Sequence, residues 1–385
     1  MNIVLLTNIL TPYRKAFFDE VYKQCVADGQ SDFRVICMAA GESDRQWRFE
    51  DLREKYTFLL KGNSLRIKNY DIHFCQDVEE MIMAGNPDII IVSGSYMLPP
   101  AWEAVKIAKK NGIKVLFWSE SHLEESRGYK SATKKLREKI RNKFYKKFDG
   151  FMYPGQKAKE FIEKYADSKV ALINIPNLID NRVFDIANTV YSKAILRDKY
   201  TIDQCKYVFF SPIRLTHVKG MLEFLDLLSK ADDKDKCQLV IAGEGELKEE
   251  IELKAKGYGI DLMMVGYRCE AEMVELYRCA DCFLLPSLAD PNPLTCIEAI
   301  WNGLPLLVSD HVGNHPEVVR EGKNGHVFSY KRQVEAINLI DEMINSGTAF
   351  KRDAADLSYD IAHEEFDIEK RTKQFINELR SLCIK

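Results

Sequence analysis

The strongest constraint on the fold is a regular alternation of short apolar runs with longer amphipathic stretches along nearly the whole chain. The runs are continuous in Ile, Val, Leu and Phe, which is typical of strands buried on both faces of a parallel sheet. The stretches between them, such as 13–26, 100–110 and 156–165, have the length and pattern of crossover helices. We expect strands at 3–7, 33–38, 88–92, 114–118, 150–153, 207–210, 238–242, 262–265, 282–285 and 306–309. The alternation therefore predicts doubly wound α/β architecture.

The length of the chain predicts two domains. A chain of 385 residues exceeds what one ordinary hydrophobic core supports. The alternation stops near 175–178 and resumes at 207. We therefore predict two Rossmann-like domains, residues 1–185 and 186–365, followed by an amphipathic helix within 366–385. The cleft between two such domains is the default place for an active site.

Composition and charge exclude several classes of protein. The net charge of −3 gives no general attraction to nucleic acid. The first residues run directly into an apolar strand without the pattern of a signal peptide, and no window reaches about 18 apolar residues. Ten scattered cysteines fit free thiols in a reducing compartment, and the single CxxC, Cys279 to Cys282, lacks the second ligand pair of a zinc site. We expect a cytoplasmic protein without a metal ion or cofactor.

Two cations follow the expected strand 207–210. Arg214 and Lys219 lie in a strand-to-helix loop, where backbone N–H groups also favour anions. An arginine can fork onto phosphate oxygens while a lysine supplies a point charge. Together they could neutralise a diphosphate without a metal. Taken alone, the same pair also fits two solvated surface cations.

Two carboxylates follow the expected strand 282–285. Asp290 lies in a proline-rich turn, and Glu298 lies just over one turn into a helix that begins near Pro293. Proline suits the first turn of a helix, and the free N–H groups of Leu294 and Thr295 would point toward a bound phosphate. The carboxylates could accept hydrogen bonds from sugar or ribose hydroxyls. Each is also consistent with a turn residue or a solvated helix position.

The order and spacing of these motifs resemble glycosyltransferase family 4, the retaining enzymes with the two-domain GT-B fold. The resemblance covers most of the second domain and includes 214–220, 239–247, 265–267, 280–287, 298–299, 302–305, Gly313, 316–317 and 324–325. It implies two Rossmann-like domains facing across a cleft, with the C-terminal helix 366–385 joined to the first. It also implies a nucleotide-sugar donor and no metal ion.

The resemblance also assigns roles to residues. Arg214 and Lys219 would bind the donor diphosphate, Glu298 the ribose hydroxyls, and Asp290 the hydroxyls of the transferred sugar. The remaining donor-binding residues would be Gly243, Gly266, Tyr267, Arg268, Asn292, Pro293, Leu294 and Thr295. His122 would lie near the donor sugar and act in catalysis, although residues 119–123 also fit a surface loop.

The chain departs from the family pattern at two places. Asp290 is one methylene shorter than the usual glutamate, and Pro291-Asn292-Pro293 replaces a glycine-rich stretch. These departures leave the identity of the donor sugar open. The opening loop 8–14 lacks the glycines of many relatives. On the acceptor side we expect Tyr13, Arg14, Ser95 and Glu120.

The stretch 127–147 has ten cations and apolar residues at helical spacing. A basic amphipathic helix suits an anionic membrane surface, and acceptors in family 4 are often linked to lipids. A core-facing stripe with a solvated cationic face is the alternative. No recognition fold for nucleic acid accompanies the patch.

These observations together predict a retaining, metal-independent glycosyltransferase. It would move a sugar from a nucleotide-diphosphate-sugar to a hydroxyl of a glycan or lipid-linked acceptor, in the synthesis of a bacterial surface polysaccharide and peripherally on the inner face of the membrane. The alternatives are a non-catalytic protein that binds a sugar nucleotide and a GT-B sugar-nucleotide epimerase.

Overall fold

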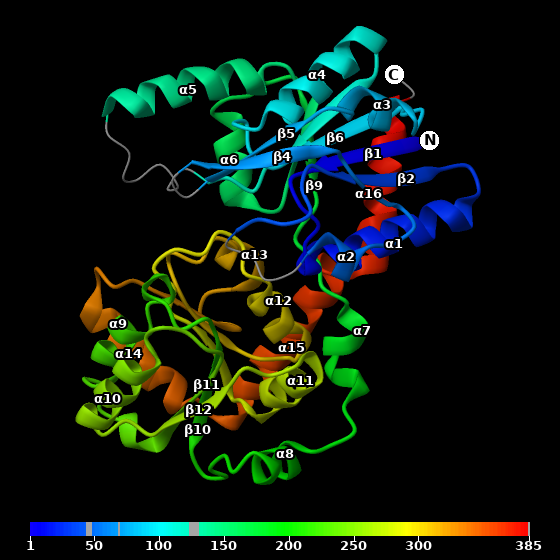
Figure 1. Ribbon diagram of the computed structural model, residues 1–385. Coiled ribbons are helices and arrows are strands. Elements are labelled where there is room, and N and C mark those ends of the chain that lie inside the picture. Colours follow the sequence, from blue (N-terminus) through cyan, green and yellow to red (C-terminus); the bar gives the residue numbers. More distant parts are fainter. Residues whose placement is uncertain (44–47, 68–69, 123–130, 384–385) are drawn as a thin grey trace. The chain divides into compact units, whose positions relative to one another are not determined.

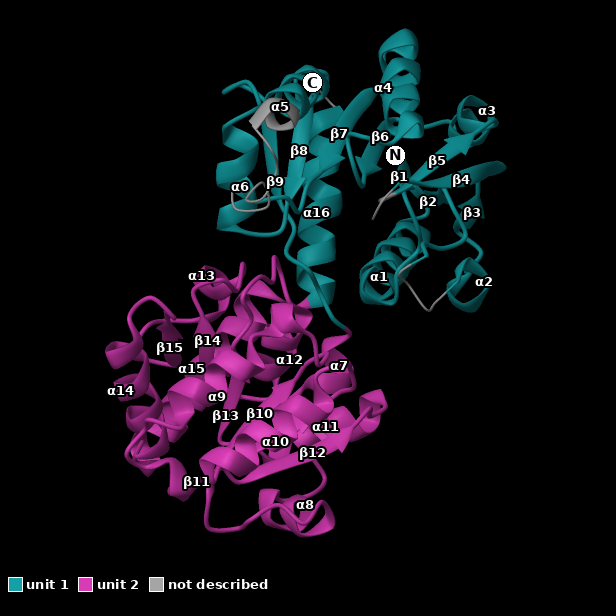
Figure 2. Ribbon diagram, turned by 60° about the vertical axis from the view of Figure 1, so that its left-hand side comes forward, with its two compact units in different colours: residues 1–179, 368–385 teal, residues 180–367 magenta. Residues whose placement is uncertain are grey.

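The computed structural model describes residues 1–43, 48–67, 70–122 and 131–383. They form two compact units, unit 1 with residues 1–179 and 368–385 and unit 2 with residues 180–367 (Figure 2). The sequence pattern puts the corresponding boundaries at 185/186 and 365/366. Among the described residues, no helix is long and apolar enough to cross a membrane.

Unit 1 is built on a parallel sheet with the strand order β3-β2-β1-β6-β7-β8-β9 (strands labelled in Figure 2). Its strands are β1 (Asn2–Thr7), β2 (Asp32–Cys37), β3 (Thr57–Leu59), β6 (Ile89–Ser93), β7 (Lys114–Trp118), β8 (Gly150–Tyr153) and β9 (Ala171–Asn174). A separate antiparallel hairpin consists of β4 (Gly62–Ile67) and β5 (Tyr70–Cys75). The order changes direction between β1 and β6, so the chain leaves these neighbouring strands toward opposite sides of the sheet.

Helices cover the sheet of unit 1. These are α1 (Pro12–Asp28), α2 (Phe49–Leu52), α3 (Val78–Met83), α4 (Pro99–Asn111), α5 (Ser131–Tyr145), α6 (Gln156–Glu163) and α16 (Ile368–Cys383). Alternate strand residues, among them Val4, Leu6 and Val92, pack into one cluster with α3 to α6. On α1, Phe17 contacts Trp118 of β7 and Phe375 of α16, with ring centroids 5.7 and 5.4 Å apart. The C-terminal helix therefore completes the core of the unit that begins the chain.

Unit 2 contains a six-stranded parallel sheet with the order β12-β11-β10-β13-β14-β15. Its strands are β10 (Tyr207–Pro212), β11 (Cys237–Ala242), β12 (Leu262–Gly266), β13 (Cys282–Leu285), β14 (Leu306–Ser309) and β15 (Gly325–Phe328). In order along the chain this is the 3-2-1-4-5-6 arrangement of a Rossmann fold. The change of direction falls between β10 and β13, which are hydrogen-bonded neighbours.

Two groups of helices cover the sheet of unit 2 (Figure 1). One group is α9 (Met221–Leu228), α10 (Lys248–Tyr258) and α14 (Gln333–Ile344). The other is α7 (Asn181–Phe184), α8 (Lys193–Lys199), α11 (Glu270–Cys279), α12 (Leu294–Trp301) and α15 (Thr348–Glu365), and the short α13 (His315–Val318) packs against α12 and α15. Cys279 and Cys282 are both buried in this unit.

The strands and helices expected from the apolar pattern are present in both units. The sequence analysis missed five strands, β3, β4, β5, β9 and β15. β3 has only three residues, β9 is mostly half-buried and ends in Asn174, β15 begins with Gly325 and His326, and every residue of β4 is exposed, so none of these produces a continuous apolar run. The sheets are parallel as expected, and the antiparallel β4–β5 hairpin is an addition that the sequence analysis did not predict.

Candidate active site

The candidate site of unit 2 lies at the carboxyl ends of β10 and β13. Ligands of doubly wound sheets bind at such a point, because the loops that follow the two strands diverge and leave space between them. Residues 213–220 follow β10, and residues 286–293 follow β13. These two loops contain five of the residues that the sequence analysis assigned to the donor, namely Arg214, Lys219, Asp290, Asn292 and Pro293.

Backbone contacts hold the two loops against each other. The amide of Leu288 donates to the carbonyl of Val218 at 2.8 Å. The Tyr330 hydroxyl lies 2.6 Å from the carbonyl oxygen of Pro286, to which it donates, and 3.1 Å from the carbonyl oxygen of Gly220. Gly220 has φ +66°, and a Cβ there would lie 2.1 Å from the Pro286 carbonyl oxygen. Only glycine fits this close approach, so the geometry of the site is built into the backbone.

Lys219 and Asp290 form an ion pair across the two loops. The Lys219 Nζ lies 2.5 Å from Asp290 Oδ2, and their side chains are only 17% and 12% exposed. The Ser287 hydroxyl also donates to Asp290 Oδ2, at 3.4 Å. The lysine is therefore held toward the point where β10 and β13 diverge, and an anion that binds there would share the ammonium with Asp290.

Arg214 is an exposed cation in the loop that follows β10, at the same carboxyl-end edge of the sheet as Lys219. Its side chain is exposed and makes no ion pair with any described residue. The loop backbone around it is fixed, because the amide of Leu215 donates to the carbonyl of Glu244 at 3.0 Å. An exposed guanidinium can donate two parallel hydrogen bonds to phosphate oxygens.

The N-terminus of α12 follows the proline-rich loop. Pro293 is buried at the N-cap position, and Leu294 and Thr295 form the first turn. The side chain of Asn314 donates to the carbonyl of Pro293 at 2.9 Å, and a Cβ at Gly313 would lie 1.6 Å from the carbonyl oxygen of Pro291. First-turn N–H groups have no acceptor within their own helix, and the helix dipole adds positive potential at this end. The α12 N-terminus therefore suits an anion.

Glu298 lies on α12 just over one turn from that end. Its half-buried carboxylate accepts a hydrogen bond from the Tyr277 hydroxyl at 2.6 Å. Burial raises the pKa of Glu298 to about 7, and the nearby Glu270 adds to the rise while the Tyr277 hydrogen bond opposes it. A carboxylate in this position can accept hydrogen bonds from ligand hydroxyls once it is ionised.

The raised pKa of Glu298 predicts a stability trend. The folded chain keeps this proton to higher pH than the unfolded chain, so its contribution to the free energy of unfolding falls as pH rises from about 4.5 to about 7. We therefore expect Glu298→Gln to gain thermal stability relative to wild type between pH 5 and pH 8. Thermal unfolding of both proteins at each pH measures the difference. The exposed Glu252→Gln is the control, and an equal difference at every pH would contradict the prediction.

The loops after β11 and β12 border the site. Gly243 approaches the chain so closely that a Cβ would lie 1.9 Å from the carbonyl oxygen of Ile213. Gly266 ends β12, and the Tyr267 ring beside it is 81% exposed. The Arg268 side chain is engaged with the carbonyl of Val265 and the carboxylate of Glu272, at 2.8 and 2.9 Å. Tyr267 is thus the side chain here that is open for stacking.

Unit 1 has its own polar network at the carboxyl ends of β1, β6 and β7. Arg14 donates to the Ser93 hydroxyl at 2.6 Å and to Glu120 Oε1 at 2.9 Å. Its guanidinium carbon lies 4.3 Å from the ring centroid of Trp118. Burial opposes the charge of Arg14, but the Glu120 carboxylate and Tyr13 together outweigh burial and raise the pKa of the guanidinium. The side chain of Glu120 is 30% exposed, so part of its carboxylate is open to solvent.

The other expected residues of unit 1 lie around this network. Tyr13 is half-buried, with its ring centroid 6.0 Å from the Arg14 guanidinium carbon. Ser95 is exposed and accepts a hydrogen bond from the amide of Met97, outside the network. His122 is half-buried and follows β7. Residues 127–130 of the basic stretch lie outside the described residues, and the rest begins with α5.

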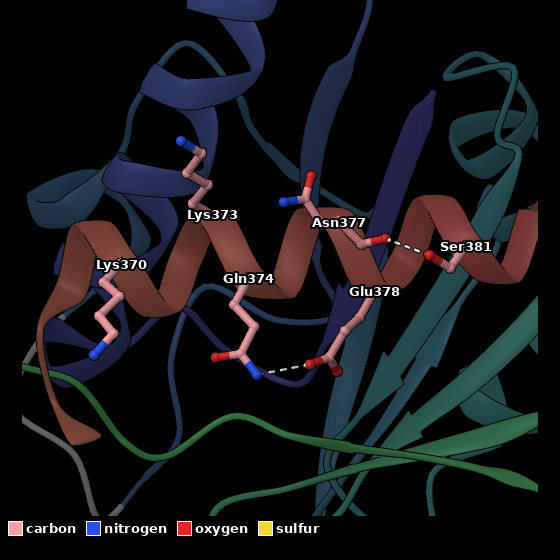
Figure 3. A pocket seen from close by; sticks show the side chains of 6 residues that line it. All are labelled: Lys370, Lys373, Gln374, Asn377, Glu378 and Ser381. Atoms are coloured by element: carbon pink, nitrogen blue, oxygen red, sulfur yellow. Dashed lines mark hydrogen bonds between the residues drawn. The ribbon is translucent and has the colours of Figure 1, made fainter. Parts of the chain in front are cut away.

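A shallow hollow on unit 1 is separate from both groups of residues. It is lined by Lys370, Lys373, Gln374, Asn377, Glu378 and Ser381 (Figure 3). All six belong to α16, and hydrogen bonds join Gln374 to Glu378 and Ser381 to the carbonyl of Asn377. One helix face supplies the whole lining, and it contains none of the expected site residues.

Comparison with known proteins defines the class of the chain. The chain has the GT-B fold. Its structure superposes on that of Anabaena HepE in complex with UDP with a TM-score of 0.73, over 99% of this chain and 100% of HepE, at 15% sequence identity. Residues 192–358, which are less than half of the chain, match the family model of glycosyl transferases group 1. The resemblance noted in the sequence is thus confirmed.

Curated relatives match over part of the chain. An uncharacterized glycosyltransferase of Methanocaldococcus jannaschii, MJ1607, is 23% identical over 53% of this chain and 52% of its own length. The α-monoglucosyldiacylglycerol synthase of Streptococcus pneumoniae is 23% identical over 59% of this chain and 51% of its own length. The chain therefore spans about half the length of each of these relatives.

Sequence reasoning missed several residues that shape the two groups. Tyr277 contacts Glu298 from 21 residues away, and Ser93 contacts Arg14 from 79 residues away. Ser93 ends an apolar strand run and could have been found by that signal, as a polar residue at a carboxyl strand end. Tyr277 lies on the buried face of α11, and its sequence pattern does not distinguish it from a residue that only packs in the core.

Proposed function

We propose that the protein is a retaining glycosyltransferase that uses a nucleotide-diphosphate-sugar as donor and a hydroxyl as acceptor. One observation carries the proposal: Lys219, Arg214 and the N-terminus of α12 lie at the switch point of unit 2. A guanidinium that can donate two parallel hydrogen bonds, an ammonium group and the free N–H groups of a helix N-terminus together suit a diphosphate. The family match of residues 192–358 and the UDP in the HepE structure support it.

The chemistry follows from where charge develops. The acceptor oxygen forms a bond to the anomeric carbon while the bond from that carbon to the diphosphate oxygen breaks. The acceptor proton passes to the departing diphosphate, and both reactions occur on one face of the sugar, so its configuration is retained. Lys219 and Arg214 stabilise the negative charge that grows on the leaving diphosphate. Glu298 would hold ribose hydroxyls and Asp290 the hydroxyls of the sugar, and these steps need no metal ion.

Unit 1 would bind the acceptor. The Glu120 carboxylate is fixed by Arg14 and open to solvent, so it can accept a hydrogen bond from an acceptor hydroxyl. Tyr13 lies near the Arg14 guanidinium, while Ser95 and His122 belong to the same edge of unit 1. The named product of the Streptococcus pneumoniae relative is a glycolipid, which supports a lipid-linked acceptor and a role in a surface glycan.

The exposed face of α5 would contact an anionic membrane surface. Lys135, Lys139, Lys143, Lys146 and Lys147 are exposed, with Leu136 61% exposed among them. Arg137 and Arg141 instead turn inward, toward the Tyr96 hydroxyl and the rings of Phe161 and Tyr165. Each lysine near an anionic bilayer contributes about 1 kcal/mol of attraction.

This surface predicts a binding defect. We expect the combined change of Lys135, Lys139, Lys143 and Lys146 to alanine to weaken binding to vesicles with 30% phosphatidylglycerol by at least about 100-fold, since about 4 kcal/mol of attraction is lost. Vesicle co-sedimentation at low and high salt measures it. The matched control replaces Lys248, Lys256, Lys234 and Lys236 of unit 2 with alanine. Unchanged binding by the α5 variant would contradict this surface.

The proposed function is tested with a panel of UDP-, GDP-, ADP-, dTDP- and CMP-sugars, each with and without a divalent-ion chelator. We expect one diphosphate donor to stabilise the protein against heat and to be hydrolysed slowly in both conditions. Binding without hydrolysis, even after candidate lipid-linked glycans are added, would favour a non-catalytic binding protein. Interconversion of sugar nucleotides would favour an epimerase, and no binding would overturn the proposal.

A further inference from the structure

The buried Tyr277 contacts Glu298 of the candidate site from the core of unit 2. Tyr277 belongs to α11 and is completely buried, whereas Glu298 belongs to α12 and is half-buried. The hydroxyl of Tyr277 lies 2.6 Å from Glu298 Oε2 and 3.3 Å from the carbonyl oxygen of Thr295. A phenol has one proton to donate, and the shorter contact to a carboxylate takes it.

The ring of Tyr277 cannot move freely. It packs edge-on against Phe210 of β10, with centroids 5.0 Å apart, and against Phe184 of α7 at 6.3 Å. On another side it stacks with Phe283 of β13 at 6.2 Å. The ring is therefore fixed by the two strands whose loops form the candidate site, and the position of its hydroxyl is set by the core of unit 2.

The hydrogen bond leaves the rest of the Glu298 carboxylate available. A carboxylate has about four acceptor positions, and Tyr277 uses one of them on Oε2. Oε1 accepts no hydrogen bond from the described part of the chain. The charged or titratable groups that face Glu298 are Tyr277 and Glu270 of α11 and Cys296 of its own helix, and none of them is a cation.

We propose that Tyr277 is a positioning residue that holds Oε2 of Glu298 so that Oε1 meets the neighbouring hydroxyls of a nucleotide ribose. This inference rests on the proposed function, because it requires that the ligand of unit 2 is a nucleotide. Without the Tyr277 hydroxyl, the Glu298 side chain would lose its orientation, and its pKa would rise because the hydrogen bond that lowers it is absent. Discrimination in favour of ribose hydroxyls would fall, while contacts to the phosphates would remain.

The test compares UDP, GDP and ADP with their 2′,3′-dideoxy analogues by calorimetric titration of the full chain. We expect wild type to bind the ribose form of its nucleotide at least tenfold more tightly than the dideoxy form. Tyr277→Phe should reduce this ratio to within about threefold and leave the affinity for the dideoxy form unchanged. Tyr258→Phe is the matched control, because the Tyr258 hydroxyl also binds a carboxylate, that of Asp226 at 2.7 Å, away from the site.

The pH profile separates positioning from simple packing. The wild-type ratio should rise as pH passes about 7, where Glu298 ionises, and the Tyr277→Phe ratio should rise only at higher pH, because the hydrogen bond that lowers the pKa of Glu298 is lost. Thermal unfolding confirms that the variant is folded. An unchanged ratio and profile in Tyr277→Phe, or a wild type that binds both forms equally, would overturn this inference alone. A wild type that binds none of the three nucleotides would overturn the proposed function with it.

Discussion

Replacement of Lys219 by alanine is expected to lower kcat/KM for the donor by at least about 100-fold, in line with the loss of a group that stabilises developing charge. Two effects add. The ammonium that balances the leaving diphosphate is removed, and Asp290, only 12% exposed, is left unpaired beside the place where the phosphates would bind. Arg214→Ala removes a cation without freeing a carboxylate, so its loss should be large but smaller than that of Lys219→Ala.

The controls for this prediction are cations of unit 2 outside the site. Lys256 on α10 and Arg352 on α15 are exposed, and their alanine variants should keep wild-type turnover. Steady-state kinetics with the donor found in the panel gives kcat and KM for each protein, and thermal unfolding checks that each is folded. Near-normal turnover of Lys219→Ala would show that the ion pair with Asp290 is structural.

Replacement of Gly313 by alanine is expected to lower the free energy of unfolding of unit 2 by about 1–3 kcal/mol, the usual cost of forcing atoms into a packed site. The added Cβ would lie 1.6 Å from the carbonyl oxygen of Pro291, which is backbone and cannot rotate away. The amide of Gly313 also donates to the carbonyl of Asp290 at 2.7 Å. A shift of this loop moves Asp290 away from Lys219, so donor binding should weaken together with stability.

Urea unfolding followed by a probe of unit 2, with donor titration of the same protein, measures both effects. Gly257→Ala is the matched control, because a Cβ at this position of α10 meets no atom within 4 Å. That change should leave stability equal or slightly higher, since alanine favours a helix over glycine. If Gly313→Ala were as stable as wild type and bound the donor normally, the contact between the loops of residues 290–293 and 310–314 would contribute neither to stability nor to donor binding.

The sequence predicted the strands and loops whose positions depend on the local pattern of apolar and polar residues. Apolar runs located ten strands of the two parallel sheets, and the strand-to-loop order located Lys219, Asp290 and the N-terminus of α12 at one edge of unit 2. The exposed hairpin strand β4 was missed because edge exposure removes the apolar run on which the prediction depends. Likewise, β3 has only three residues, and polar residues or glycine break the apolar run in β9 and β15.

The contacts that orient the site side chains could not be predicted. Arg14 meets Glu120 from 106 residues away, and Tyr277 meets Glu298 across two helices. Such pairs depend on how helices pack on the sheet, which sequence spacing does not specify. The ion pair between Lys219 and Asp290 is of the same kind: both residues were expected in the site, and their mutual contact emerged only from the folded loops.

The central claim is that the loops at the switch point of unit 2 bind a nucleotide-diphosphate-sugar. Hydrogen–deuterium exchange of the full chain with and without saturating UDP, GDP or ADP tests it most directly, because backbone amides report where the ligand binds. The account predicts that the nucleotide that binds will slow exchange in residues 213–220 and 286–298. Slower exchange confined to other segments, or no change with any nucleotide, would contradict it.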